Sequence, residues 1–177
     1  MEFFETVNSR HSYRGPYTDA PVPDADLVKI VEAGIKAPSA ANWQTTSFVI
    51  VNDPEVLNKI RALAPDIKGL NTCQALIAVV ADGPEESPRP GLFFGVQDYA
   101  AATENMLLAI TALGYASVWT EGMLARDDNA RTVGDLLDVP SPKKVRVLLP
   151  VGVPAEPLAD RGRKPFVERA HWNHWSK

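Results

Sequence analysis

Cysteine is scarce in this sequence and long hydrophobic runs are missing, and both absences narrow the class of protein. The single cysteine, Cys73, cannot form an internal disulfide, which is typical of a reducing compartment. The richest apolar stretch, 96–113, is interrupted by Thr103-Glu104-Asn105 and falls short of the roughly 20 apolar residues that span a bilayer. No charged leader followed by an apolar core opens the chain. We therefore expect a cytoplasmic protein that has no membrane partner.

A surplus of positive charge is also missing. Against 18 lysines and arginines stand 22 acidic residues, so that the formal net charge is −4 and the pI is near 5.4. Nucleic-acid binding depends largely on a basic surface, and we expect no nucleic acid as a partner. The 177 residues are 45% hydrophobic and contain no repeat or dividing linker, so we predict a single domain over 1–177 with one sizeable core.

Several motifs with known chemistry are absent as well. Neither Gly-x-Gly-x-x-Gly after a strand nor Gly-x-x-x-x-Gly-Lys-Ser/Thr occurs, which excludes the Rossmann and P-loop ways of holding phosphate. There is no cysteine pair and no His-Glu-x-x-His. His171 and His174 are two imidazoles near each other, fewer than the three or four protein ligands of ordinary zinc sites. We expect no metal, and we assign both histidines to a packed or surface tail.

What the sequence does contain is an alternation of helical and strand patterns. Helical spacing predicts helices over 2–9, from Asp24 up to Pro38, after Asp53-Pro54, over 96–113 and over 127–137. Apolar runs predict strands over 47–51, 74–81, 115–119 and 144–151. The 74–81 run shows no alternation, which indicates a strand buried on both faces.

A cationic stretch follows the first predicted helix. Arg10, Ser12 and Arg14 stand at alternate positions, so that an extended backbone would point all three toward one side. Two guanidinium forks and a hydroxyl suit the oxygens of a phosphate, although a solvated turn is the plainer interpretation. A second cationic cluster lies at 161–164, after the last predicted strand. Both clusters can serve one ligand only if the fold brings the two ends of the chain together.

Two further segments are candidate parts of a binding site. The polar loop 39–44 offers donors and acceptors to a planar heterocycle, and Thr120-Glu121-Gly122 leaves a predicted strand at a glycine, where backbone can come near a ring. Taken singly, such a segment is more often an ordinary loop or turn than a binding site. Cys73 stands beside a buried strand without a fixed histidine partner, which is typical of an inert core residue.

Taken together and in this order, the segments resemble the nitroreductase family of FMN-dependent flavoproteins. The resemblance rests on Arg10-His11-Ser12-x-Arg14, on Ala37-Pro38-Ser39-x-x-Asn42-x-Gln44 and on Gly114 to Gly122, and it covers the chain from Phe4 to Phe166. It implies an α+β fold of three layers, in which a central, mainly antiparallel sheet is flanked by helices. It also implies an intertwined homodimer with each FMN at the subunit interface.

The resemblance further implies which residues hold the cofactor. They are Arg10, His11, Ser12, Arg14, Pro38, Ser39, Asn42, Asn71, Glu121, Gly122, Arg161, Arg163 and Lys164. The first three and the last three would meet the phosphate and the ribityl chain. Arg14 and Asn71 would reach the pyrimidine edge, and the backbone at 121–122 would face flavin N5. The loop 38–42 would come from the other subunit.

The implied activity is hydride transfer from NADPH or NADH, through FMN, to nitroaromatics, quinones or similar electron-poor small molecules. Donor and acceptor would occupy the same flavin face in turn, which gives ping-pong kinetics. No side-chain acid or base is required, and we name no catalytic residue. Phe93 and Phe94 are candidates to supply a ring over the substrate, and core packing is the alternative for either.

The chain also departs from the family pattern. Thr45-Thr46 stands where members often have proline and tryptophan, and Gln74 stands where some have lysine. The connection 82–94 is shorter than the helical segment that covers the substrate in many relatives. The short connection would leave the flavin face more open. An alternative function is therefore that of a flavin-binding carrier or sensor with little turnover.

Overall fold

The structure is a computed structural model that describes residues 1–87, 89 and 91–175. Its helices and strands follow in the order α1 (Phe3–Ser9), α2 (Asp24–Ile35), η1 (Ala40–Asn42), β1 (Thr46–Val51), α3 (Pro54–Ala62), α4 (Lys68–Thr72), β2 (Ala75–Ala81), η2 (Pro84–Glu86), α5 (Gly95–Ala112), α6 (Asn129–Leu136), β3 (Lys144–Val151) and α7 (Phe166–Arg169). Within the described residues no helix is both long enough and apolar enough to cross a membrane.

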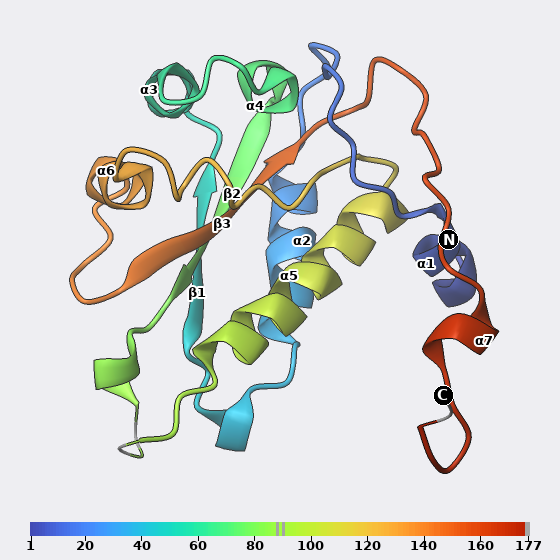
Figure 1. Ribbon diagram of the computed structural model, residues 1–177. Coiled ribbons are helices and arrows are strands. Elements are labelled where there is room, and N and C mark those ends of the chain that lie inside the picture. The colour runs from blue at the N-terminus through green and yellow to red at the C-terminus, as the bar shows by residue number, and fades with distance from the viewer. Residues whose placement is uncertain (88, 90, 176–177) are drawn as a thin grey trace.

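Three strands form one antiparallel sheet in the order β1-β2-β3 (Figure 1). Thr46 of β1 lies opposite Ala81 of β2, and Val51 lies opposite Leu76 at the other end. All seven residues of the central strand β2 are buried. The unbroken apolar run at 74–81 therefore predicted a doubly buried strand correctly.

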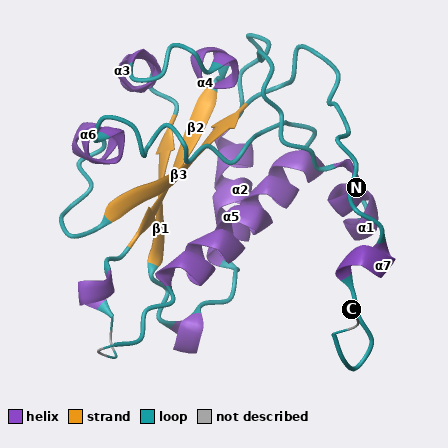
Figure 2. Ribbon diagram, in the orientation of Figure 1, coloured by secondary structure: helices purple, strands orange, loops and turns teal. Residues whose placement is uncertain are grey.

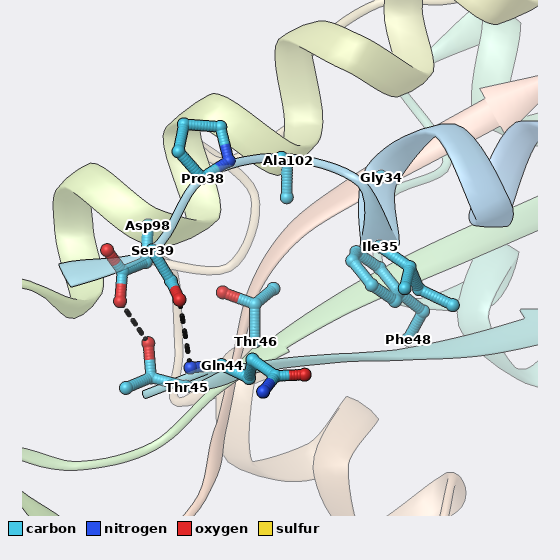
Figure 3. Close-up of a pocket in the computed structure, with 11 residues that line it drawn as sticks. Gly34, Ile35, Pro38, Ser39, Gln44, Thr45, Thr46, Phe48, Asp98 and Ala102 are labelled. Carbon is cyan, nitrogen blue, oxygen red and sulfur yellow. Dashed lines mark hydrogen bonds between the residues drawn. The ribbon is translucent and has the colours of Figure 1, made fainter. Parts of the chain in front are cut away.

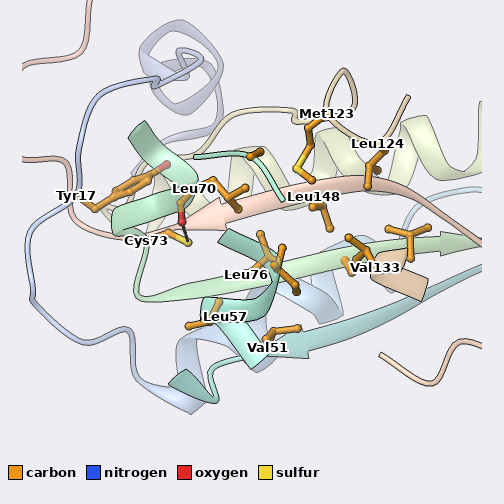
Figure 4. Packing of buried hydrophobic residues seen from close by; sticks show 14 of the residues in the cluster. Tyr17, Val51, Leu57, Leu70, Cys73, Leu76, Met123, Leu124, Val133 and Leu148 are labelled. Carbon is orange, nitrogen blue, oxygen red and sulfur yellow. Dashed lines mark hydrogen bonds between the residues drawn. The ribbon is translucent and has the colours of Figure 1, made fainter. Parts of the chain in front are cut away.

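Helices cover both faces of the sheet, as Figure 2 shows. Along β2, Leu76 belongs to the apolar cluster with α3, α4 and α6, and its neighbour Ile77 belongs to the cluster with α2 and α5. This alternation follows from the pleat of a strand. The first of the two clusters is drawn in Figure 4. The predicted α+β class with helices around a small antiparallel sheet is confirmed.

Local sequence explains several of the element ends. The Asp53 carboxylate accepts hydrogen bonds from the backbone N–H groups of Glu55 (2.7 Å) and Val56 (3.2 Å), which caps α3. Gly114 follows α5 with a φ of 86°, a conformation that glycine adopts at low cost. A Cβ on Gly34 would stand 2.8 Å from Cγ of Met106, so glycine allows α2 to approach α5 closely.

Two predictions about the elements fail. Helix α4 was not expected, because its five residues are too few to show a helical period. The segment 115–119 is not a strand, since only single bridges join Ala116 to Gly152, Ser117 to Ser12 and Thr120 to Leu148. Pairing at isolated positions with two different segments prevents a continuous ladder.

The two ends of the chain leave the layered body. Helices α1 and α7 lie away from the sheet on the far side of α5 (Figure 1). Both present apolar side chains to solvent, and the tail after α7 does the same. The exposed fractions are 63% for Phe3, 78% for Phe4, 64% for Phe166, and 82% each for Trp172 and Trp175. We call these two segments, 1–9 and 158–175, the terminal arms.

Candidate functional site

A cavity of about 420 Å³ opens where the chain between α5 and α6 passes the amino end of α4. Arg14 lines it from the amino-terminal basic stretch, Lys68 lines it from α4, and residues 118–123 form the facing segment. Three parts of the chain that are distant in sequence therefore converge here, two of them predicted as site segments.

The 118–123 segment is hydrogen-bonded to β3 through Thr120 and borders open space at Gly122. Thr120 and Leu148 of β3 exchange backbone hydrogen bonds of 3.0 and 2.9 Å. The indole Nε1 of Trp119 donates to Oε2 of Glu121 at 2.9 Å. At Gly122, an added Cβ would meet no heavy atom within 4 Å, so the backbone borders open space. A flat ring can approach the chain closely at this glycine.

The position of Arg14 is set by backbone pairing between residues 12–13 and Ser117. Ser12 forms a parallel bridge with Ser117, and the backbone N–H of Tyr13 donates to the Ser117 carbonyl at 2.9 Å. The ring of Tyr13 is 4% exposed and contacts that of Tyr17 at a centroid distance of 5.2 Å. The next residue, Arg14, is thereby held at the cavity wall.

Lys68 is a cavity residue that the sequence interpretation missed. The amide nitrogen of Asn71, expected at the pyrimidine edge, donates instead to the carbonyls of Pro65 (2.9 Å) and Ile67 (3.0 Å) in the turn before α4. Residues 66–69 line the cavity at this point, so that the exposed Lys68 stands at its wall. Some relatives have lysine at position 74, where this chain has Gln74; here the unpredicted helix α4 places a lysine, Lys68, at the cavity.

A second charged pair stands at the rim of the cavity. Nη1 of Arg126 lies 3.1 Å from Oδ2 of Asp66, and both side chains are more than half exposed. Hydrogen bonding from this guanidinium lowers the pKa of the Asp66 carboxyl below its ordinary value. The charged residues that line the cavity are therefore three cationic side chains, Arg14, Lys68 and Arg126, and two carboxylates, Asp66 and Glu121.

The remaining basic candidates gather outside this cavity. Arg10 lies 3.5 Å from Glu104 of α5 through its Nε, and Nδ1 of His11 lies 3.9 Å from Oδ1 of Asp160. The second contact brings Asp160, the residue before the second cationic cluster, beside the amino-terminal stretch. The cations at 161, 163 and 164 are exposed. Arg10 and Arg14, expected on one side, point to different surroundings because Arg10 ends α1 and faces α5.

The loop candidates lie at the other end of the sheet. Pro38 and Ser39 line a small cavity of about 60 Å³ between α2, the loop and α5 (Figure 3). Asn42 is exposed. Phe94 is 38% exposed and its ring contacts that of Trp43 at 6.4 Å. The loop precedes β1, and Phe94 precedes α5. The Arg14 cavity, in contrast, adjoins α4.

The distance between the two ends follows from the register of the sheet. The loop leads into Thr46, which pairs with Ala81, and α4 leads into Ala75 at the opposite end of β2. Six residues of β1 extend about 17 Å at the rise of a strand. Within one chain, the loop candidates and the Arg14 cavity are therefore separate sites.

Two other side-chain groups have an evident structural role. Cys73 is fully buried, and burial raises the pKa of its thiol from 9.0 to about 11, which agrees with the inert core residue expected from sequence. His171 stacks on Trp175 at a centroid distance of 4.3 Å. In the part of the chain that the structure describes, no group of three or more His, Cys, Asp or Glu is arranged to hold a metal ion.

Comparison with known proteins agrees with this fold. The profile of the nitroreductase family matches residues 7–69 and 66–153. A protein of Archaeoglobus fulgidus, assigned by name as an NADH dehydrogenase/NAD(P)H nitroreductase, is 36% identical over 176 residues, which are 97% of this chain and 99% of the relative.

Solved structures share the whole fold. A protein of Parabacteroides distasonis with the same assigned name matches with a TM-score of 0.83 and 28% identity over 98% of both chains. The NADPH:FMN oxidoreductase of Vibrio harveyi, solved with NAD⁺, matches with a TM-score of 0.82 and 24% identity over 99% of this chain and 78% of that one.

The fold and these relatives define the class as that of NAD(P)H-dependent oxidoreductases. Within that class, the chain belongs to the nitroreductase family.

Proposed function

We propose that the protein binds FMN and transfers hydride from NADPH or NADH to nitroaromatic, quinone or similar electron-poor acceptors. The observation that carries this proposal is the cavity in which Arg14 and Lys68 stand with the open backbone at Gly122. When bound, FMN supplies the hydride chemistry. Support also comes from the NADPH:FMN oxidoreductase that shares the fold.

The residues of this cavity suit the cofactor in charge and in shape. Arg14 and Lys68 would stabilise negative charge at the pyrimidine edge of the ring system, because preorganised cations in a partly enclosed site act strongly on developing charge. The 121–122 backbone would border the ring near N5. Arg10, His11 and the tail cations at 161–164 would meet the phosphate, since the contact of His11 with Asp160 brings the start of that tail segment beside the amino-terminal stretch.

We infer that the functional unit is a homodimer of single-domain subunits. The 38–42 loop and the Arg14 cavity lie at opposite ends of one sheet, so both can contact one flavin only if they come from two subunits. The terminal arms expose large apolar side chains that a monomer would leave in water, and such surface is typical of an interface. Phe93 and Phe94, beside that loop, would then lie near the acceptor.

The reaction follows a ping-pong course in this proposal. Reductant and acceptor would use the same open face at Gly122, so one must leave before the other enters. We name no proton donor among the side chains. The enzymatic relatives favour turnover over the alternative of a flavin carrier or sensor. A cytoplasmic location belongs to the proposal too and is supported by the buried free thiol of Cys73.

The visible absorption spectrum of the purified protein, before and after anaerobic addition of NADPH or NADH, tests the proposal. We expect a flavin spectrum that bleaches on addition of the reductant and returns with menadione or nitrofurazone. Steady-state rates at several fixed acceptor concentrations should give parallel double-reciprocal lines. A colourless protein that takes up no FMN would refute the cofactor assignment. Binding without turnover would favour the carrier.

A further inference from the structure

The loop 39–45 has a backbone conformation that its own residues do not favour. Ala41, Asn42 and Gln44 have φ angles of 48°, 58° and 53°. Residues with a Cβ atom rarely occupy this left-handed region, because Cβ crowds the following carbonyl oxygen. Three such residues among four consecutive positions make the conformation dependent on contacts from outside the loop.

Asp98, in the first turn of α5, supplies those contacts. Its Oδ1 accepts a hydrogen bond from the backbone N–H of Ala40 at 2.9 Å. Its Oδ2 accepts one from Oγ1 of Thr45 at 2.8 Å, which Figure 3 shows. Ala40 and Thr45 flank the strained residues on both sides. A single carboxylate therefore holds the two ends of the loop together.

The burial of the Asp98 carboxylate indicates that it holds the loop 39–45 in place. Asp98 is 5% exposed and Thr45 is also 5% exposed, so the contact is shielded from water. A buried carboxylate is costly unless its oxygens receive hydrogen bonds, and here both do. The position in the first turn of α5 adds a favourable interaction with the helix dipole.

The loop itself adds one closing contact. Oγ of Ser39 accepts a hydrogen bond from the backbone N–H of Gln44 at 3.0 Å, across the strained residues (Figure 3). Asn42 is exposed in the middle of the loop, and Pro38 and Ser39 line the small cavity beside it. The residues that the family resemblance assigns to the cofactor are thus carried by the part of the loop that Asp98 fixes.

We propose that Asp98 is a positioning residue for the flavin site. Its carboxylate fixes the loop 39–45 in the conformation in which Ser39 and Asn42 reach the flavin held by the partner subunit. The inference rests on the FMN function proposed above. It extends that function to a residue outside the set that the family resemblance assigns to the cofactor, one whose side chain accepts hydrogen bonds from Ala40 and Thr45.

Substitutions on both sides of the contact test this role. Asp98→Asn replaces one acceptor oxygen by an NH₂ group, and Thr45→Val removes the hydroxyl donor while keeping the shape of the side chain. Thr45→Ser keeps the hydroxyl and serves as the conservative variant. Thr103→Val is the matched control, because Thr103 is a fully buried threonine of the same helix whose hydroxyl donates to the Tyr99 carbonyl at 2.7 Å, away from the loop.

Two measurements on the full-length protein separate positioning from general stability. One is the dissociation constant of FMN, followed by quenching of flavin fluorescence. The other is hydrogen exchange of the 38–46 segment in the FMN-free protein. For Asp98→Asn and Thr45→Val we expect FMN affinity to fall about 10-fold or more and exchange of the segment to accelerate by a similar factor, as for other lost hydrogen bonds to a charged group. Thr45→Ser and Thr103→Val should resemble the unsubstituted protein in both measurements.

The inference is overturned if Asp98→Asn and Thr45→Val leave both measurements unchanged. It is also overturned if Thr103→Val lowers FMN affinity as much as they do, since the effect would then be general destabilisation. If the unsubstituted protein binds no FMN, the proposed function fails, and with it the assignment of Asp98 to a flavin site. The exchange comparison would still decide whether Asp98 fixes the loop.

Discussion

The sheet core and the terminal arms of this protein use apolar residues in opposite ways. In the core, Leu76 and Ile77 are fully buried on the two faces of one strand. In the arms, Phe4 and Trp172 are 78% and 82% exposed. The core therefore completes its packing within one chain, whereas the arms leave apolar side chains exposed, as an interface of the proposed dimer would require. Stability and assembly should respond to different substitutions.

Truncation of the core should have the largest effect on folding. Leu76→Ala would leave a cavity at the centre of the sheet, and we expect the free energy of unfolding to fall by about 2–5 kcal/mol. Urea denaturation followed by circular dichroism measures this loss. A loss below about 1 kcal/mol would show that the core is packed less tightly than the burial of β2 indicates.

Polar substitution in both arms should break assembly and spare the subunit core. For the double variant Phe4→Ser and Trp172→Ser we expect dissociation of the proposed dimer, because aromatic anchors at an interface contribute about 2 kcal/mol or more each. Sedimentation velocity measures the dissociation, and circular dichroism should show unchanged secondary structure. Val28→Ser, on an exposed position of α2, is the matched control (49% exposed). If the unsubstituted protein sediments as a monomer, the terminal arms do not form a dimer interface and the prediction is wrong.

The Arg14 cavity adjoins α4, away from the terminal arms. Substitution of Arg14 should therefore weaken ligand binding and leave folding unchanged. For Arg14→Gln we expect FMN affinity to fall about 10-fold or more, the effect of losing a charge-assisted contact. Titration of FMN with the variant protein measures this. Arg131→Gln is the control, because Arg131 is an exposed residue of α6 outside that cavity. Equal effects of the two changes would indicate a long-range charge effect instead of a contact.

The smallest expected effect concerns the thiol inside the core. Burial raises the pKa of Cys73 from 9.0 to about 11, so native protein should resist alkylation at pH 8 until it unfolds in urea. Between pH 9 and pH 11 the unfolded chain releases this proton more readily than the native one. The contribution of the group to stability therefore decreases as pH rises through that range. Rapid labelling of native protein at pH 8 would contradict the buried position.

Local patterns predicted those parts of the molecule that depend on near neighbours in sequence. The run at 74–81 identified the buried central strand, and the capping residue Asp53 with Pro54 identified the start of α3. The segment 115–119 looked like a strand from its composition. It forms only single bridges, because pairing partners belong to the tertiary structure and leave no mark on the segment itself.

The candidate site was predicted in part. Arg14, Glu121 and Gly122 were named from the sequence and do line one cavity. Lys68 was missed because α4 is too short to give a periodic signal, and Asn71 was placed in the site although its amide binds the turn before that helix. Asp98 could not be found from sequence, since an acidic residue at a helix start is common and its partners lie more than 50 positions away.

The sequence alone determined the class of fold, the buried strand, the family and most of the segments that could meet a flavin, since periodicity, caps and ordered motifs are local properties of the chain. The tertiary structure alone decided which of these segments meet. It separated the loop 38–42 from the Arg14 cavity by the length of a strand. It also placed the carboxylate of Asp98 within hydrogen-bond distance of both ends of the strained loop. Such contacts join residues far apart in sequence and depend on burial and geometry that only the folded chain defines.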